Sequence, residues 1–272
     1  MYQFRPSLTL VGAGKMGFAL LHGWLDRDLA GPETVVLEPA PSGEAKAFCA
    51  ARGARLNPPG EPVAPRTLVL AIKPQMLDQL APILEPLAAP DTLVVSILAG
   101  KRVADLSARL PRTQAFVRAM PNTPAAIGRG VTGAFATAGV SAEQRACADV
   151  LLRAVGGVEW LDDEALIDAV TGVSGSGPAY VFYLAEALAE AGRAAGLPAD
   201  LSARLARATV EGASALMSQS ESVTPGQLRE NVTSPGGTTA AALEVLMGKD
   251  GLKALMTRAV AAATRRAEEL SG

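Results

Sequence analysis

Near the start of the chain, the sequence reads Ser7-Leu8-Thr9-Leu10-Val11-Gly12-Ala13-Gly14-Lys15-Met16-Gly17. An apolar run leads into three glycines spaced Gly-x-Gly-x-x-Gly, and a helix-forming segment follows at once. Gly12 permits a tight turn, Gly14 lets the backbone approach a pyrophosphate, and Gly17 lets the helix pack closely on the strand. The free N–H groups and positive dipole end of that helix favour phosphates. The order of strand, turn and helix therefore predicts a dinucleotide site, whereas the glycines alone would be weak evidence.

The composition is that of a globular protein with one large or two modest domains. The chain has 272 residues, of which 49% are hydrophobic, so it can bury a core. Its 25 basic and 27 acidic residues give a net charge of −2 with no block of like charge. Because a nucleic-acid backbone demands a concentrated basic face, we expect no nucleic-acid partner.

The sequence also lacks the marks of a secreted, membrane or metal protein. It has no basic-then-apolar leader and no apolar run of ~18 residues, so we expect a cytoplasmic protein without a membrane segment. Cys49 and Cys147 form no disulfide or metal pattern, and we interpret both as small core residues of helices. No His-Glu or Cys-His cluster indicates a metal, and we expect none.

Up to residue 163, short β-rich runs alternate with helical patterns, which predicts a mostly parallel, doubly wound sheet with helices on both faces. The expected strands are Leu8–Val11, Thr34–Leu37, Ala54–Leu56, Leu68–Ile72, Leu93–Ile97, Ala115–Arg118, Val131–Ala136 and Val158–Leu161. The expected helices are Met16–Asp28, Gly43–Ala51, Gln75–Leu87, Val103–Arg109 and Ala142–Val155. Prolines 58, 59, 62 and 65 mark a surface loop.

From Glu164 to residue 272 no strand-like run remains, which predicts a second, all-helical domain. The expected helices are Ala165–Thr171, Gly177–Ala195, Ala199–Ser218, Thr238–Met247 and Gly251–Leu270, with breaks at Gly196-Leu197-Pro198 and Thr224-Pro225-Gly226. Several helices are apolar on more than one face and need more cover than one small domain supplies. We therefore expect an obligate dimer; the alternative is a monomer with one fully internal helix.

Glu38 stands at the end of the second expected strand, 21 residues beyond Gly17. In dinucleotide folds this place meets the adenosine ribose. A carboxylate there accepts hydrogen bonds from both ribose hydroxyls and repels the extra phosphate of NADPH. The loop from Pro39 to Gly43 holds no Arg or Lys to neutralise that phosphate. The sequence thus favours NADH over NADPH, unless Glu38 simply points into solvent.

Several loops stand where strands of such a sheet end, and ligands bind outside those ends. They are Ala71–Pro74, Ser96–Gly100 and Arg118–Pro124. Pro74 stiffens one turn, and Asn122 offers hydrogen bonds suited to a carboxamide. Each loop alone is more typical of an ordinary strand exit, and only their joint occurrence points to a ligand.

Two glycine-rich turns in the helical part each lead into a helix: Val173–Tyr180 and Asn231–Thr239. A helix N-terminus with two glycines and nearby hydroxyls is suited to a small carboxylate. A merely capped helix would need one Ser or Thr and not the whole cluster.

The absence of an evident proton donor limits the chemistry. A dehydrogenase acting on an alcohol or ketone usually needs His, Lys or Tyr to move the proton. The one histidine, His22, falls in the first helix, and we interpret it as a packed or surface group. A cyclic imine needs less help, since it arrives protonated and its iminium carbon accepts hydride directly. A hydroxyl bonded to the ring nitrogen would suffice, with positioning supplying much of the rate.

Five motifs together resemble the pyrroline-5-carboxylate reductase family: Gly12–Gly17, Ala71–Pro74, Met120–Pro124, Val173–Tyr180 and Ser234–Thr239. They follow the family's order over essentially the whole chain. The resemblance implies reduction of 1-pyrroline-5-carboxylate to L-proline, the last step of proline biosynthesis, with NADPH or NADH. It also implies an α/β N-terminal Rossmann domain, and an all-α C-terminal domain that interlocks into homodimers and often homodecamers.

The resemblance also carries residue roles onto matching positions. The cofactor-binding positions would be Gly12, Ala13, Gly14, Lys15, Met16 and Gly17 at the pyrophosphate, Ile72, Lys73, Pro74 and Ala99 along the cleft, Asn122 near the nicotinamide, and Asn231 from across the dimer interface. The substrate carboxylate would be bound by Ser234, Gly236, Gly237 and Thr238. Thr239 would bond the ring nitrogen as the catalytic hydroxyl. Glu164 would lie near the substrate.

Two positions depart from the family's pattern, and both concern the cofactor. Relatives commonly carry Ser, Thr or Asn where this chain has Glu38, and Gly60 replaces a polar residue sometimes found beside the adenine ribose. Two other classes compete with the resemblance. A β-hydroxyacid dehydrogenase would need a catalytic lysine in the helix from Pro178 to Ala195, which has none. An NADH-sensing dimer without chemistry would not need the Ser234–Thr239 cluster.

Overall fold

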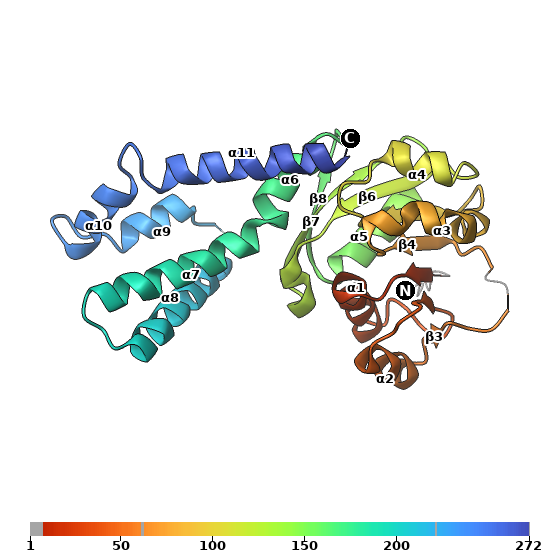
Figure 1. Ribbon diagram of the computed structural model, residues 1–272, viewed down its shortest axis with the longest axis horizontal. Coiled ribbons are helices and arrows are strands. Elements are labelled where there is room, and N and C mark those ends of the chain that lie inside the picture. Colours follow the sequence, from red (N-terminus) through yellow and green to blue (C-terminus); the bar gives the residue numbers. More distant parts are fainter. Residues whose placement is uncertain (1–7, 61–62, 221, 272) are drawn as a thin grey trace. The chain divides into compact units, whose positions relative to one another are not determined.

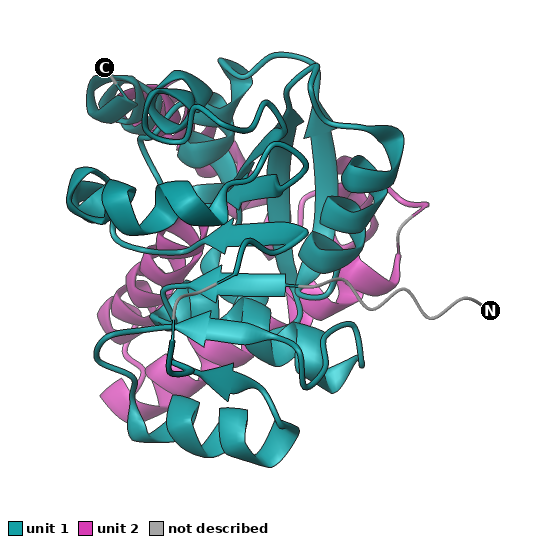
Figure 2. Cartoon of the chain, turned by 90° about the vertical axis from the view of Figure 1, so that its right-hand side faces the viewer, with its two compact units in different colours: residues 1–175, 263–272 teal, residues 176–262 magenta. Residues whose placement is uncertain are grey.

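The computed structural model describes residues 8–60, 63–220 and 222–271. Ser7 of the first strand motif and Pro62 of the expected surface loop lie outside them. The chain forms two compact units, coloured separately in Figure 2: Met1–Gly175 with Ala263–Gly272, and Ser176–Ala262. The helix α6 (Leu166–Val170) and the end of the last helix thus belong to the first unit. The domain boundary between residues 163 and 164 stays a prediction.

The first unit contains one sheet of eight strands, ordered β3-β2-β1-β4-β5-β6-β7-β8. All neighbouring strands are parallel except β6 and β7. This confirms the expected mostly parallel sheet (Figure 1). The strands are β1 (Leu8–Val11), β2 (Val35–Leu37), β3 (Arg55–Leu56), β4 (Thr67–Leu70), β5 (Leu93–Ser96), β6 (Phe116–Met120), β7 (Gly130–Ala136) and β8 (Gly156–Leu161).

Helices cover both faces of this sheet because the strand residues alternate between two cores. In β4, Val69 belongs to one core, while Leu68 and Leu70 belong to the other. The first core includes side chains of α1 (Lys15–Asp26), α2 (Gly43–Arg52) and α5 (Ala142–Arg153). The second includes side chains of α3 (Leu77–Leu84) and α4 (Val103–Arg109).

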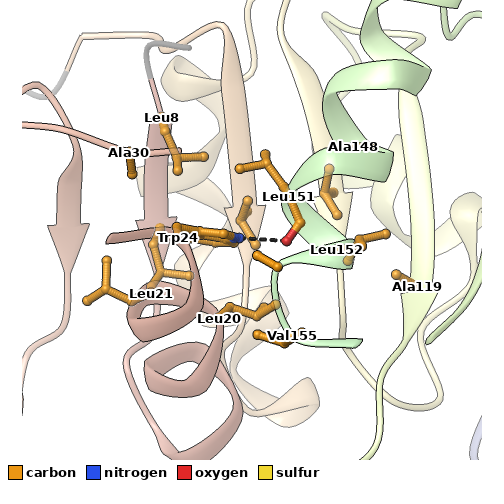
Figure 3. Close-up of a cluster of buried hydrophobic side chains, with 14 of the residues drawn as sticks. Leu8, Leu20, Leu21, Trp24, Ala30, Ala119, Ala148, Leu151, Leu152 and Val155 are labelled. Atoms are coloured by element: carbon orange, nitrogen blue, oxygen red, sulfur yellow. Dashed lines mark hydrogen bonds between the residues drawn. The ribbon is translucent and has the colours of Figure 1, made fainter. Parts of the chain in front are cut away.

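Trp24 of α1 is the largest fully buried side chain of the first core. Its indole N–H donates to the backbone oxygen of Leu151 on α5 at 2.8 Å, as the dashed line in Figure 3 marks. Burial of an aromatic ring with its one polar atom bonded holds α1 and α5 together on the sheet. This packing fixes the helix that follows the glycine turn.

Two segments differ from the expected helices. The segment expected as Gln75–Leu87 is divided into a 3₁₀ turn at Pro74–Met76, α3, and a second 3₁₀ turn at Glu85–Leu87. Pro86 has no N–H for a continuing α-helix and stands two residues after the end of α3, whereas Pro82 is accommodated inside the helix. The glycine-rich turn expected at Val173–Tyr180 is helical at its start, because one π-helical turn, Thr171–Gly175, directly follows α6 (Leu166–Val170). The helix expected after this turn is confirmed, with Pro178 in its first turn.

The second unit is helical, as expected. It consists of α7 (Gly177–Ala194), α8 (Ala199–Gln219), α9 (Pro225–Asn231), α10 (Thr238–Leu246) and the start of α11 (Leu252–Ser271). Helix α9 was not expected, because Thr224-Pro225-Gly226 reads as a break. The Thr224 hydroxyl instead caps the helix by accepting from the N–H of Gln227 at 3.2 Å, and Pro225 stands in the first turn.

The second unit leaves many large apolar side chains exposed. On α7, Phe182 is 65% and Tyr183 70% exposed, and Val181, Leu184 and Leu188 are also exposed. Among the described residues of this unit, only Ser202 and Ala206 are buried. The helices of the second unit therefore bury almost no side chains among themselves. No helix among the described residues is long and apolar enough to cross a membrane.

Candidate functional site

A cleft of about 890 Å³ opens at the carboxyl ends of β1, β2 and β4. It is lined by four residues of the glycine turn, Gly12, Ala13, Gly14 and Lys15, by Glu38 after β2, and by Ile72 and Lys73 after β4. These residues were singled out from sequence, and the structure brings them to one place. This is where ligands bind in doubly wound sheets.

The three glycines of the turn do different work. A Cβ at Gly12 would lie 2.6 Å from the backbone oxygen of Ala71, and one at Gly17 would lie 2.2 Å from the oxygen of Gly12. Both glycines therefore permit close backbone approach inside the protein. A Cβ at Gly14 would meet no protein atom within 4 Å. The space beside Gly14, at the N-cap of α1, is open to a phosphate group.

Glu38 is fixed by its own hydrogen bonds at the rim of the cleft. Its Oε2 accepts from the N–H of Ala13 at 2.8 Å, and its Oε1 accepts from the N–H of Ala40 at 3.0 Å. The side chain is half-buried and lines the cleft. The carboxylate therefore points to the glycine turn and not outward into solvent.

Sequence reasoning missed the apolar wall of the cleft. Met76, Leu80, Ile83 and Leu84, which follow the β4 exit, line the cleft, as do Leu37 of β2 and Phe18 of α1. Ile83 is 54% exposed, although it is large and aliphatic. The spacing of Leu80, Ile83 and Leu84 is helical, and this was the signal that could have placed them on one face.

Other expected cofactor residues lie outside this cleft. Met16 is half-buried against the first core. Ala99 is exposed after β5, and Pro74 begins a 3₁₀ turn. The amide of Asn122 is engaged within the first unit, where Nδ2 donates to the oxygen of Ser174 at 3.1 Å and Oδ1 accepts from the N–H of Val131 at 2.9 Å. Contacts of these residues with a nucleotide stay predictions.

Glu164 belongs to a charged network of the first unit. Its Oε1 accepts from the N–H of Val103 at 2.8 Å and from Nη1 of Arg118 at 3.1 Å. Arg118 is 2% exposed and also contacts Asp168 at 3.5 Å. Asp168 in turn accepts from the hydroxyl of Ser271 at 3.3 Å. Among the described residues Oε2 of Glu164 has no partner, and its expected substrate contact stays a prediction.

The turn before α10 presents free polar groups in the second unit. Gly236 adopts a φ of 71°, and the N–H of Gly237 donates to the oxygen of Ser234 at 3.0 Å. Within the described part of the chain, the hydroxyls of Ser234, Thr238 and Thr239 make no hydrogen bond to protein atoms. These hydroxyls and the N-terminal N–H groups of α10 are therefore available to a small anion.

Asn231, at the end of α9, is exposed. Its Oδ1 accepts from Nε2 of Gln227 at 3.0 Å. Its expected reach to a cofactor across the dimer interface stays a prediction.

The reactive side chains elsewhere are not arranged as catalysts. His22 is exposed on α1, where Nδ1 lies 2.9 Å from Asp26 and the ring stacks on Phe48, outside the cleft lining. Burial raises the pKa of the Cys49 and Cys147 thiols, which keeps them in the unreactive thiol form. This agrees with the interpretation of all three as packed or surface groups.

A doubly wound sheet with a glycine-rich turn and an acidic residue after its second strand is the arrangement of NAD(P)-binding domains, and the class it points to is an NAD(P)-dependent oxidoreductase. Family models match both parts of the chain: "NADP oxidoreductase coenzyme F420-dependent" at residues 7–100 and "Pyrroline-5-carboxylate reductase dimerisation" at residues 164–270. Together with a pyrroline-5-carboxylate reductase that is 42% identical over 98% of this chain, these matches show that the chain belongs to the pyrroline-5-carboxylate reductase family.

Individual members of the family match nearly the whole chain. Pyrroline-5-carboxylate reductase of Pseudomonas aeruginosa is 42% identical over 98% of this chain and 97% of its own length. The solved reductase from Coxiella burnetii is 33% identical, with a TM-score of 0.87 over 99% of this chain and 100% of its own. The Plasmodium falciparum enzyme, solved with NADP bound, is 26% identical, with a TM-score of 0.80 and 98% coverage of both chains. The dimerisation model also accounts for the exposed apolar helices of the second unit.

Proposed function

We propose that the chain reduces 1-pyrroline-5-carboxylate to L-proline and uses NADH in preference to NADPH. Family membership supports the reaction. The observation that carries the cofactor preference is the Glu38 carboxylate inside the cleft, held by the N–H groups of Ala13 and Ala40. The bound reduced nicotinamide would supply the hydride.

The chain's own residues explain how the dinucleotide is held. The open space beside Gly14 and the N-terminus of α1 receive the pyrophosphate. The remaining lone pairs of Glu38 accept from the ribose hydroxyls, and the same charge disfavours a 2′-phosphate. The apolar side chains of Leu80 and Ile83 suit the flat face of an adenine ring. The proposed cofactor set is completed by the remaining positions that the resemblance implies, which are Lys15, Met16, Ile72, Lys73, Pro74, Ala99, Asn122 and Asn231.

The substrate end of the site is proposed at the turn before α10. The N–H groups of Gly236, Gly237 and Thr238 and the hydroxyl of Ser234 bind the carboxylate, as helix N-termini bind anions. The hydroxyl of Thr239 bonds the ring nitrogen and fixes the carbon that is reduced. Because the imine arrives protonated, positioning supplies the rate without a separate acid. Glu164 stays a proposed substrate residue through its unbonded Oε2.

The proposed assembly follows from the dimerisation region. Two chains pair through the apolar helices of the second unit, and the decamer that the resemblance implies is tested by sedimentation velocity. A β-hydroxyacid dehydrogenase is disfavoured because α7 contains no lysine. Location in the cytoplasm stays a prediction from sequence.

Steady-state reduction of 1-pyrroline-5-carboxylate with each nicotinamide in parallel tests both parts of the proposal. We expect proline as the product and a higher kcat/KM with NADH than with NADPH. No proline with either nicotinamide would refute the reaction. Proline formation with a preference for NADPH would refute the role given to Glu38 alone.

A further inference from the structure

The peptide groups of Glu38 are held from the side by one asparagine. Oδ1 of Asn57 accepts from the N–H of Glu38 at 2.9 Å, and Nδ2 of Asn57 donates to the backbone oxygen of Glu38 at 2.7 Å. Because one bond needs an acceptor and the other a donor, the two contacts fix the orientation of the amide. Asn57 itself is anchored to β2, since its N–H donates to the oxygen of Val36 at 2.8 Å.

The side-chain amide of Asn57 replaces the backbone hydrogen bonds that a longer β3 would make to Glu38. β2 and β3 pair in parallel, with Val36 opposite Leu56. One step further along this ladder, Glu38 would donate to the oxygen of residue 57 and accept from the N–H of residue 59. Residue 59 is proline and has no N–H. Asn57, with a φ of 45°, turns off the ladder and uses its side chain for both bonds.

This arrangement determines where the Glu38 carboxylate lies. The backbone of Glu38 is held by Asn57 on one side, and its carboxylate by Ala13 and Ala40 on the other. Glu38 and Asn57 both line the same cleft. Without the amide, the peptides of Glu38 lose both lateral partners, and only the N–H groups of Ala13 and Ala40 still hold the carboxylate. The carboxylate is then held less firmly beside the glycine turn.

We propose that Asn57 is a positioning residue for cofactor choice, acting through Glu38 to favour the unphosphorylated nucleotide. The inference rests on the proposed NADH preference and extends it to a residue that does not itself carry charge. It accounts for an exposed asparagine with a positive φ between a strand and two prolines.

The test measures binding of NADH and NADPH to the full chain by isothermal titration calorimetry, without the imine substrate. In Asn57→Gly, glycine keeps the positive φ without strain and removes both side-chain hydrogen bonds. We expect NADH to bind about 3- to 10-fold more weakly, as for loss of one or two exposed hydrogen bonds. NADPH, whose 2′-phosphate is repelled by the Glu38 carboxylate, should bind no more weakly than to the wild type. Asn57→Ser, whose side chain is too short to bridge both groups, should shift the NADPH/NADH ratio in the same direction even if the glycine variant folds poorly.

Two further variants separate a role through Glu38 from a general effect on the strand. In a Glu38→Gln background, Asn57→Gly should leave the NADPH/NADH ratio within about twofold, because no charge remains to be positioned. Arg55→Gln, an exposed change in the same strand, should leave both affinities unchanged. Wild-type affinities in both Asn57 variants, or an equal loss for both nucleotides, would overturn the inference. So would an Arg55→Gln variant that moved the ratio as far as the Asn57 variants.

This result is independent of the proposed reaction. A wild-type chain that binds NADH but forms no proline would refute the reductase activity and leave the binding comparison valid. A chain that forms proline while its Asn57 variants bind both nucleotides normally would refute the inference alone.

Discussion

Replacing Glu38 by glutamine removes one charge from the rim of the cleft and keeps a side chain of the same shape. A carboxylate ~4 Å from the 2′-phosphate of NADPH would repel it by about 1 kcal/mol in bulk water and by about 4 kcal/mol at an effective dielectric of ~20. Glu38 is half-buried, so a value between these limits applies. Taking ~2 kcal/mol, the NADPH/NADH ratio of kcat/KM should rise about 30-fold. The hydrogen bonds from Ala13 and Ala40 are weakened for both nucleotides alike and cancel in the ratio.

The assay is steady-state reduction of the imine with each nicotinamide, at low and high salt. Glu44→Gln is the matched control, because Glu44 lines the same cleft but is exposed in the first turn of α2. It should change the ratio less than about threefold. In the wild type, 1 M salt should reduce the discrimination, since the screening length falls to ~3 Å. A Glu38→Gln ratio equal to the wild-type ratio would show that the carboxylate does not meet the 2′ position.

Three other changes test other parts of the molecule. Thr239→Ala should lower kcat by about one to three orders of magnitude, as for loss of one placed hydrogen bond, while gel filtration still gives the dimer; an unchanged kcat would remove its catalytic role. Gly17→Ala should cost about 1–3 kcal/mol of unfolding free energy in urea, because its Cβ would lie 2.2 Å from the oxygen of Gly12; full stability would contradict the close packing. The pKa of Asp149 is lowered, since burial, which raises it, is outweighed by hydrogen bonds, chiefly from Arg153. Its stabilisation is therefore present above the unfolded pKa of about 3.9 and is lost as the pH falls through the lowered value. The Tm difference between wild type and Asp149→Asn should be constant from pH 8 to about 5 and shrink below about 4. A difference that grows on acidification would refute this.

The alternation of β-rich and helical runs was sufficient to predict the sheet. Most of the strands are short apolar runs bounded by glycine, proline or polar residues, so local pattern and tertiary structure agree. The exception is β3, which has only the two residues Arg55 and Leu56. The glycine turn was predictable for the same reason. Gly12 and Gly17 are required because a Cβ at either would clash with backbone atoms of the motif itself or of the segment after the neighbouring strand.

What sequence did not reveal depends on partners far along the chain or on backbone geometry. The two bonds between Asn57 and Glu38 join residues 19 positions apart, and nothing in a single sequence marks that pairing. The π-helical turn at Thr171–Gly175 contains two glycines, which read as a loop. It is helical because of its setting: Gly172 is buried, and a Cβ at Gly175 would lie 2.9 Å from the Met120 side chain. Helix α9 was missed because Thr224-Pro225-Gly226 is typical both of a break between helices and of the start of a helix.

The small number of buried side chains in the second unit has a consequence for how the protein responds to dilution. In the dimer that the family model implies, a second chain would cover the apolar surfaces of α7 to α10, so their melting should depend on protein concentration. The sheet carries two cores of its own, so its melting should depend on concentration less. A sample too dilute to pair would then keep its nucleotide cleft while losing the turn that carries Thr239, and a nucleotide-binding assay alone would not detect the loss of turnover.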